Sequence, residues 1–283
     1  MRSFKATGWR HLYGIALLVV ALFPILFILS ASLNPTGSVA DTNQLFKSVS
    51  FANYKKLFSD PQHPFLDWFV NTQVLAVSTA VITVFLGAMA AYAFSRYRFR
   101  GRESGLVGLL LIQMFPQLLA YIALFLLLSS IAEVFPALGL GSRLGLMFVY
   151  LGGALGVNTW LLKGFFDTVP RDLDESAYID GASHAQIFFR IMLPLVTPIL
   201  VVVGLLSYVS TMGELVLARI LLGDDVHKQT MAVGLFGFIS QQFNQNWGVF
   251  AAGAIIGALP LIILFQFLQR YIVGGLLAGS VKG

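Results

Sequence analysis

Apolar residues in this chain are grouped into long runs, and polar residues are confined to the segments between them. A helix needs about 20 mostly apolar residues to cross the hydrocarbon core of a bilayer. The runs therefore predict an all-α integral membrane protein with six transmembrane helices. We expect these spans over residues 12–33, 70–94, 106–128, 144–162, 195–217 and 249–271. Pro116 falls inside the third, where neighbouring helices can satisfy the backbone carbonyl that a proline frees.

The first run also has features of a secretory signal peptide, because Arg2, Lys5 and Arg10 precede it. The apolar part of a signal peptide is usually only about 7–15 residues long. Since this run is longer, we expect the chain to keep it as a transmembrane helix.

Composition supports the membrane interpretation. Of the 283 residues, 57% are hydrophobic and only 11% are charged, whereas a soluble domain carries roughly 25% charged residues. So few charges argue against a soluble enzyme, a disordered chain and a nucleic-acid-binding module. The chain has no cysteine, which excludes disulfides, cysteine-ligated metals and thiol catalysis.

Lys and Arg predict the orientation of the chain. With the N-terminus in the cytoplasm, the inner segments hold 12 of the 18 basic residues and the outer segments hold 6. Four arginines lie in the short inner segment 96–102 alone. Because basic residues concentrate in cytoplasmic loops, we expect both tails, residues 1–11 and 272–283, in the cytoplasm.

The interiors of the spans are almost free of ionisable groups. Glu214, near the outer end of the fifth span, is the only acidic residue within one. An ion-coupled carrier usually needs carboxylates at mid-depth, so we expect a path for a neutral solute. Amides and phenols can donate to and accept from solute hydroxyls. The candidates for lining this path are Asn71, Gln113, Gln117, Asn158, Tyr208 and Glu214. Hydrogen bonding between helices is the alternative for each of them.

The cytoplasmic segment 163–194 has the most informative pattern. Acidic residues at positions 172, 174 and 175 favour the positive end of a short helix, and Gly181 suits a left-handed C-terminal cap. Ser183 and Gln186 form a capping box for a second helix that leads into the fifth span. Two such helices could close the cytoplasmic face of the membrane domain or dock a soluble partner, and the pattern alone leaves both open.

This segment carries a family resemblance. Glu175-Ser176-Ala177, then Gly181, then Ile191-Met192-Leu193-Pro194 resemble the EAA motif of the permease subunits of binding-protein-dependent ABC importers. The spacing matches throughout, and Ser176 stands where alanine is common.

Other segments resemble the carbohydrate-uptake branch of that family, and within it the MalG-like subunits of maltose, maltodextrin and trehalose transporters. The segments that carry this second resemblance are Asn71-Thr72, Gln113-Met114-Phe115-Pro116 and the tail 275–283. Met212-Gly213-Glu214 departs from the Trp-Asn-Glu that is frequent there, which puts the detail of the following outer segment in doubt.

The resemblance implies the type I ABC importer permease fold, in which a coupling helix in segment 163–194 contacts a cytoplasmic ATPase. It assigns this contact, or the return of the chain into the fifth span, to Asp174, Glu175, Ser176, Ala177, Gly181, Ile191, Leu193 and Pro194. The implied partners are a second, MalF-like permease, a MalK-like ATPase dimer, an extracytoplasmic sugar-binding protein and membrane lipid. The implied location is the cytoplasmic membrane of a bacterial or archaeal cell.

The chain shows no Walker A sequence. ATP and magnesium would therefore be bound by the partner ATPase, and we expect no cofactor, metal or catalytic residue in this chain. The function that the resemblance implies is that of a non-enzymatic permease subunit which forms half of a sugar path.

The outer segment 219–246 is expected to be a loop. The resemblance implies that it reaches into the sugar-binding protein, and an ordinary solvated loop is the alternative. The candidates for that contact are Asp224, Asp225, Gly234, Gln241 and Asn244.

Three other functions compete with a sugar permease. They are an ABC permease for a different small solute, an ion-coupled secondary carrier and an integral membrane enzyme. A carrier would need charges at mid-membrane depth, and an enzyme would need a cluster of polar groups, whereas the four histidines are scattered over different loops. The sequence does not identify the sugar.

Overall fold

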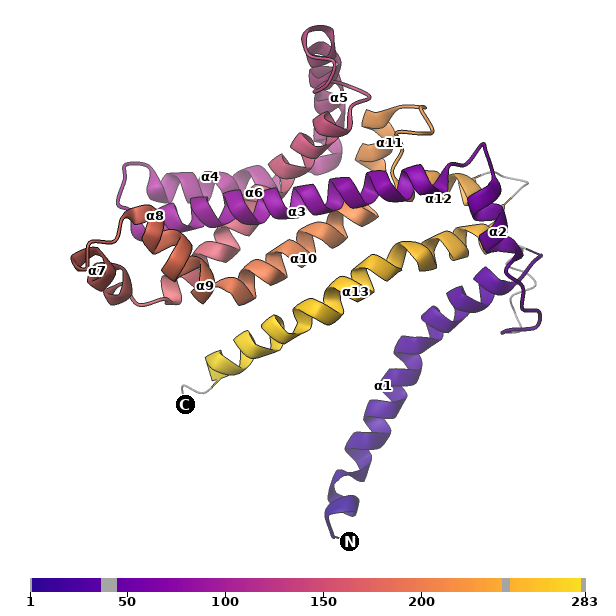
Figure 1. Cartoon of the computed structure of the whole chain (residues 1–283), viewed down its shortest axis with the longest axis horizontal. Helices are drawn as coiled ribbons and strands as arrows, with labels where there is room; N and C mark the ends of the chain where they lie inside the picture. The colour runs from indigo at the N-terminus through magenta and orange to yellow at the C-terminus, as the bar shows by residue number, and fades with distance from the viewer. Residues whose placement is uncertain (1, 37–44, 241–244, 281–283) are drawn as a thin grey trace. The chain divides into compact units, whose positions relative to one another are not determined.

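The computed structural model describes residues 2–36, 45–240 and 245–280, and within these ranges every regular element is a helix (Figure 1). The longer helices are α1 (Arg2–Leu33), α3 (Phe65–Arg96), α4 (Arg102–Met114), α5 (Gln117–Val134), α6 (Arg143–Thr168), α10 (Thr197–Gly213) and α13 (Trp247–Ser280). The shorter ones are α2 (Ala52–Ser59), α7 (Asp172–Ile179), α8 (His184–Gln186), the π-helix η2 (Ile187–Met192), α9 (Leu193–Leu195), α11 (Val216–Leu222) and α12 (Met231–Ser240).

In the described part of the chain, five helices are long and apolar enough to cross a membrane, and a bent helix pair makes a sixth candidate. The pair consists of His184–Leu195 and Thr197–Gly213, which meet at 78°. Contacts divide the chain into two compact units, Met1–Leu66 with Val233–Leu259 and Asp67–Ala232 with Pro260–Gly283.

In the first unit, a buried amide closes the C-terminal end of α1. Asn53 on α2 donates hydrogen bonds to the carbonyl oxygens of Ser32 at 3.0 Å and Asn34 at 2.7 Å. Gly248 on α13 lies directly against Asn53, since a Cβ there would come within 2.4 Å of the amide nitrogen. The last carbonyls of a helix need partners from outside it, and this amide supplies them.

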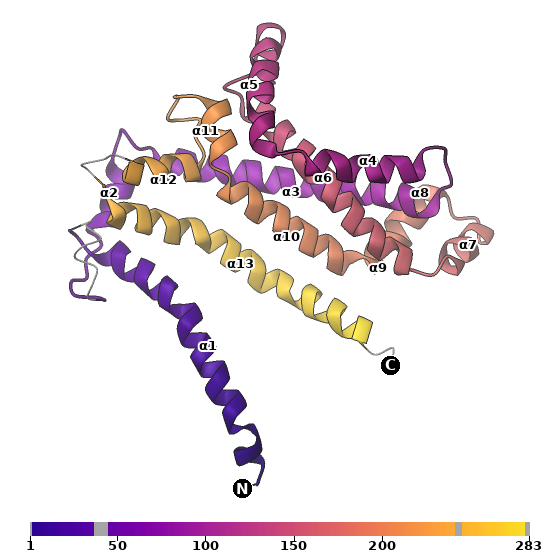
Figure 2. The same ribbon diagram turned by 180° about the vertical axis from the view of Figure 1, so that it is seen from behind.

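In the second unit, α3, α6 and α10 enclose an apolar core with the segment that follows α7. Tyr92, Phe166 and Val203 are buried in it, one from each long helix, and Met192 joins them from η2. α4 packs along α6, and α5 turns sharply away from α4 (Figure 2). This arrangement positions both the cavity and segment 163–194, which are described below.

The third expected span, 106–128, is not one continuous helix. α4 ends at Met114, Phe115 and Pro116 are extended with ψ of 131° and 111°, and α5 begins at Gln117. A proline disfavours the helical conformation in the residue before it, so the break falls where the two residues meet. The apolar helix long enough to span is therefore Gln117–Val134.

Proline also alters the fifth expected span, 195–217. Pro194 and Pro198 flank Val196, where the chain bends between α9 and α10, and α10 ends at Gly213. The outer segment 219–246 contains helical residues as well, because α11 extends to Leu222 and α12 runs over Met231–Ser240. The expectation of a loop over this segment is corrected accordingly.

Candidate functional site

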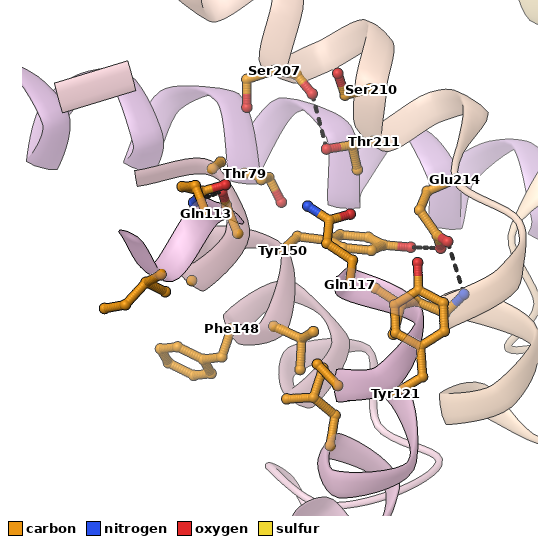
Figure 3. Close-up of a pocket in the computed structure, with 18 of the residues that line it drawn as sticks. Thr79, Gln113, Gln117, Tyr121, Phe148, Tyr150, Ser207, Ser210, Thr211 and Glu214 are labelled. Atoms are coloured by element: carbon orange, nitrogen blue, oxygen red, sulfur yellow. Dashed lines mark hydrogen bonds between the residues drawn. The ribbon is translucent and has the colours of Figure 1, made fainter. Parts of the chain in front are cut away.

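A cavity of about 1300 Å³ opens in the second unit among α3, α4, α5, α6 and α10 (Figure 3). Its wall is mostly apolar, with a set of hydroxyl, phenol and amide side chains and a single charged residue. The polar members are Thr79, Gln113, Gln117, Tyr121, Tyr150, Asn158, Ser207, Ser210, Thr211 and Glu214. Because no lysine or arginine is among the described residues that line it, the cavity suits a neutral, hydroxyl-rich solute.

Glu214, the charged residue of this wall, is held by three donors. Its carboxylate accepts hydrogen bonds from the Tyr150 hydroxyl at 2.8 Å and from the backbone N–H groups of Leu217 at 2.7 Å and Ala218 at 2.9 Å. The N–H groups in the first turn of a helix have no partner within the helix, and a carboxylate that accepts hydrogen bonds from them supplies one. The positive end of the helix dipole in turn stabilises the negative charge of the carboxylate. Glu214 thus joins α6 to the start of α11 beside the cavity.

The Gln113 side chain can lie directly against α6 because α6 has glycines at the point of contact. Its amide donates to the carbonyl oxygen of Gly153 at 2.7 Å, and a Cβ on Gly156 would come within 2.9 Å of the same amide nitrogen. Gly152 and Gly156 lie one turn apart on α6, and only Gly156 takes part in this helix contact, since Gly152 faces open space.

Two hydroxyls at the cavity wall have no hydrogen-bond partner. Thr79 Oγ1 on α3 and Ser207 Oγ on α10 are buried and unpaired in the described structure. A buried hydroxyl without a partner costs free energy, so a solute hydroxyl that reached either atom would bind favourably.

The structure brings together four of the six path candidates, namely Gln113, Gln117, Asn158 and Glu214. The other two lie outside the cavity and bond within the protein. Asn71 is buried, donates to the carbonyl oxygens of His227 at 2.8 Å and Gln229 at 3.0 Å, and accepts from Arg143. The Tyr208 hydroxyl donates to Gln73 at 2.5 Å.

Sequence reasoning missed the hydroxyl side of the cavity. Ser207, Ser210 and Thr211 occupy positions i, i+3 and i+4 of α10, which places them on one helix face. That spacing was a usable signal. Thr79 lies seven residues after Thr72 and four before Thr83 on one face of α3, which was a second usable signal. Tyr150 has only apolar residues and glycines within five positions on α6 and offered none.

Segment 163–194 has the expected local structure. α7 begins at Asp172 with three acidic residues in its first turn, Gly181 follows with a φ of +84°, and the Ser183–Gln186 capping box is complete. Pro170 lies just before the helix, outside its first turn. Gly181 is required here because side-chain-bearing residues rarely adopt such a φ.

The coupling candidates on α7 differ in exposure. Glu175 and Ser176 are exposed, whereas Ala177 is buried in the core of the unit and Asp174 is turned inward. Leu173, Tyr178 and Ile179 add exposed apolar surface to the same helix.

The remaining coupling candidates lie where the chain returns toward α10. Ile191 and Leu193 pack against the core, and Pro194 is exposed in α9. These residues therefore belong to the segment that packs behind α7 and not to the outer face of α7.

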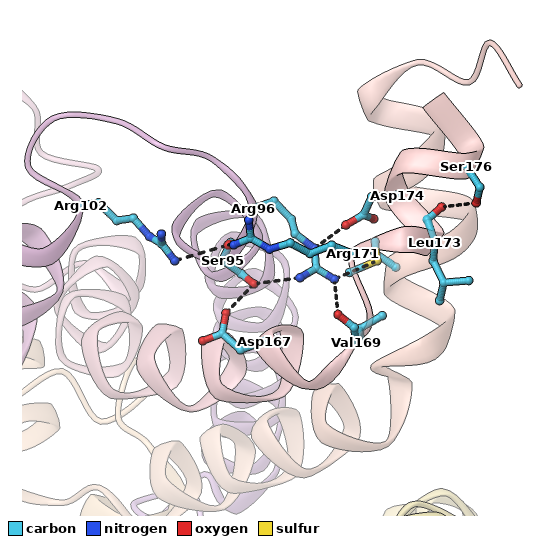
Figure 4. Close-up of polar contacts among 10 residues, drawn as sticks. Ser95, Arg96, Arg102, Asp167, Val169, Arg171, Leu173, Asp174 and Ser176 are labelled. Carbon is cyan, nitrogen blue, oxygen red and sulfur yellow. Dashed lines mark hydrogen bonds and ion pairs between the residues drawn. The ribbon is translucent and has the colours of Figure 1, made fainter. Parts of the chain in front are cut away.

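Polar contacts tie this segment to the end of α3 (Figure 4). Ser95 donates to Asp167 at 2.7 Å, and Asp167 also pairs with Lys163 at 2.5 Å. Arg102 donates to the carbonyl oxygen of Phe94 at 2.6 Å. Arg102, one of the four arginines that predict orientation, thus also satisfies a carbonyl at the end of α3, where positive charge is favourable.

The candidates for contact with a binding protein do not form one loop. Asp224 and Asp225 are exposed in the turn after α11, where Asp225 pairs with Lys228 at 3.5 Å. Gly234 is buried inside α12. Gln241 and Asn244 lie outside the described residues. Among the described residues, no three His, Asp or Glu side chains are grouped closely enough to hold a metal ion.

Comparisons with known proteins agree on one class. A family model described as a binding-protein-dependent transport system inner membrane component matches residues 83–277. Over all of its length the chain is 39% identical to the maltose/maltodextrin transport system permease protein MalG of Vibrio vulnificus (strain YJ016), of which it covers 98%.

Two Bacillus subtilis (strain 168) proteins are comparably similar. The chain is 40% identical to the maltodextrin transport system permease protein MdxG, with 96% of the chain and 95% of that protein covered. It is 38% identical to the galactooligosaccharides transport system permease protein GanQ, with 94% and 92% covered.

Among solved structures, a bacterial ABC transporter involved in the import of the acidic polysaccharide alginate matches with a TM-score of 0.74 at 24% identity, over 96% of this chain and 98% of that one. At this identity the match shows the fold, which is that of an ABC importer permease.

Proposed function

The chain belongs to the family of binding-protein-dependent transport system inner membrane components, and from this premise we propose that it is the permease subunit of an ATP-driven importer of neutral oligosaccharides. It forms half of the translocation path, and a second, MalF-like permease forms the other half. Maltose and maltodextrins are the first candidate solutes, because full-length relatives are named for them.

The cavity is the observation that carries this proposal. Its polar lining consists of hydroxyls, phenols and amides, and the one charged group, Glu214, is already held by three donors. Such a wall can exchange hydrogen bonds with sugar hydroxyls and offers no cation to a sugar acid. We therefore propose that neutral saccharides are accepted and that acidic saccharides are excluded at this surface.

Energy for transport comes from a partner in this proposal. α7 presents Glu175 and Ser176 to solvent on a helix whose base is fixed in the apolar core. We propose that this face docks on a cytoplasmic, MalK-like ATPase dimer, which binds ATP and magnesium. ATP-driven closure of the dimer would then rock the helices around the cavity, as in alternating access.

The orientation follows from the basic residues. Arg96 and Arg102 lie at the α7 end of α3 and α4, and both tails are proposed to lie in the cytoplasm, on the same side of the membrane. The turn that contains Asp224 and Asp225 would then face the extracytoplasmic sugar-binding protein.

A galacto-oligosaccharide permease is the second candidate, because GanQ is nearly as similar to the chain as the maltodextrin proteins are. Both candidates are neutral sugars, so the lining of the cavity does not separate them.

Purification of the native complex tests the proposal. We expect a second permease and an ATPase to co-purify with the chain, and the ATPase to be stimulated by a sugar-binding protein loaded with maltotriose or a galacto-oligosaccharide. The sugar that stimulates identifies the solute. Isolation of the chain without an ATPase, or hydrolysis that no loaded binding protein stimulates, would contradict the proposal.

A further inference from the structure

We infer that the ion pair between Arg96 and Asp174 is the joint that makes α7 and the cavity-lining helix α3 move as one body. The inference rests on the proposed function, because it names the residues that transmit movement from the ATPase to the path. It also moves Asp174 from the ATPase contact, which the family resemblance implies, to a contact within this chain.

The pair is direct and largely buried. Arg96 Nε lies 2.5 Å from Asp174 Oδ2, and the two side chains are only 7% and 17% exposed. The outer face of α7 is different, since Glu175 and Ser176 next to Asp174 are exposed. Asp174 thus points toward α3 while its neighbours remain available to a partner.

Backbone contacts reinforce the pair from both sides (Figure 4). Arg96 Nη2 donates to the carbonyl oxygen of Val169 at 2.8 Å, just before α7. In return, Arg171 Nη2 donates to the carbonyl oxygen of Ser95 at 3.3 Å. The end of α3 and the start of α7 therefore exchange donors in both directions, which fixes their relative orientation as well as their distance.

Burial makes this joint hard to open during a transport cycle. In the described part of the chain, Arg96 supplies the only ion pair of Asp174, and neither the carboxylate oxygens nor Arg96 Nε make a hydrogen bond, so the contact is one of charge. Pulling the helices apart would leave two unpaired charges in a poorly solvated place, which is strongly unfavourable. The pair is therefore expected to persist while weaker contacts rearrange.

The joint links elements that the chain itself does not connect. α7 is joined through the backbone to α6 and to the segment leading into α10, whereas α3 precedes both. α3 also carries Thr79 of the cavity wall, about 25 Å from Arg96 along a straight helix. A displacement of α7 is thus passed along α3 to the part of the cavity wall that contains Thr79.

Charge reversal tests the joint in the complete transporter, reconstituted with its partner subunits and supplied with the sugar that the wild type imports. We expect Arg96→Asp and Asp174→Arg each to raise the ATP hydrolysed per sugar imported by about tenfold or more. The double variant, Arg96→Asp with Asp174→Arg, restores the opposite charges and is expected to recover most of the coupling. Arg98→Asp, at an exposed position two residues away, is the matched control and leaves the ratio unchanged.

Two results would overturn the inference. One is an unchanged ratio in both single variants, and the other is a double variant no better coupled than the worse single one. Sugar uptake by the wild type tests the proposed function separately, so failure of that function is recognised before the variants are compared.

A second pair of variants covers the case in which charge reversal prevents assembly. Since the chain has no cysteine, Arg96→Cys with Asp174→Cys can be joined specifically by a short bifunctional thiol reagent. We expect the unlinked variant to be uncoupled and the cross-linked one to regain coupling, whereas a monofunctional reagent restores nothing. A linked transporter that stays uncoupled would contradict a rigid joint.

Discussion

Glu214 illustrates how one residue serves structure and site together. Its carboxylate joins two elements by accepting from Tyr150 on α6 and from two backbone N–H groups of α11. Removal of the carboxylate would leave these donors unpaired, at about 1–3 kcal/mol each for buried groups. Its place at the cavity wall is therefore set by the capping of α11 as much as by the solute.

We predict that Glu214→Ala lowers the thermal stability of the purified complex clearly more than Tyr150→Phe, which removes only one of the three hydrogen bonds. Unfolding can be followed by the fluorescence of the four tryptophans. Equal shifts for the two variants would show that capping of α11 contributes nothing.

Gly181 is the residue on which the bend after α7 in segment 163–194 depends. Its φ is +84°, and a Cβ there would meet no atom of this chain within 4 Å. A larger side chain therefore costs backbone strain of roughly 1–2 kcal/mol and projects toward whatever docks on this surface.

For Gly181→Arg we predict normal membrane insertion with uptake reduced by about tenfold or more, because the side chain would separate the docked surfaces. Gly181→Asn is the control, since asparagine tolerates a left-handed backbone and adds less bulk and no charge. Uptake per copy of the transporter is measured for both. Normal uptake in the arginine variant, with the ATPase still bound, would refute docking at this surface.

At the scale of elements, close approach of α4 and α6 depends on one glycine of a pair. Gly156 lies against the Gln113 amide, whereas Gly152, one turn earlier, faces open space. The Gly253 position shows the same close approach in the other unit, because a Cβ there would come within 2.3 Å of Leu235.

We predict that Gly156→Ala weakens uptake while Gly152→Ala does not. The added methyl group at position 156 displaces the Gln113 amide from its bond to Gly153, and the same group at position 152 gains helix propensity of up to about 1 kcal/mol. Transport rates of the two alanine variants measure the difference. A lower rate for Gly152→Ala than for Gly156→Ala would reverse the interpretation.

Sequence patterns predicted elements best where the signal was local. Hydrophobic runs located the long helices, and the positions of Gly181, Ser183 and Gln186 predicted the bend and cap of the coupling segment. The break at Phe115–Pro116 and the bend at Val196 were not predicted, because a proline in an apolar run can either kink a helix or end it. Neighbouring helices decide between these outcomes, and their positions are not visible in a single sequence.

The lack of information on neighbouring helices also explains why only some of the cavity-lining residues were predicted. A polar residue in a span can line a path or bond to another helix, and its sequence context does not differ. Gln113 and Gln117 line the cavity, whereas Asn71 and Tyr208 bond to the segment after α11 and to α3. The ion pair between Asp174 and Arg96 was not predicted either, because the two residues lie far apart in sequence. Arg96 had also already been explained as one of the basic residues that set the orientation of the chain.

At the scale of the whole molecule, every proposed role depends on the orientation of the chain in the membrane. α7 can meet a cytoplasmic ATPase only if the arginine-rich end of α3 is inside, and the turn with Asp225 must then be outside. The absence of cysteine from the sequence makes this testable with single introduced thiols.

We predict that Asp225→Cys is labelled by a membrane-impermeant maleimide added to intact cells or spheroplasts, whereas Arg98→Cys is labelled only after the membrane is opened. Both positions are exposed in the structure, so a difference in labelling reports the side of the membrane. The reverse pattern would invert the orientation and place α7 on the wrong side for an ATPase.

The most direct test of the central claim is sugar uptake by the complete transporter in proteoliposomes, with its binding protein outside and ATP inside. The account predicts that radiolabelled maltotriose or a galacto-oligosaccharide accumulates only when hydrolysable ATP is present, and that an excess of an acidic oligosaccharide does not compete. Uptake that continues without ATP, or that an ion gradient alone supports, would contradict the account.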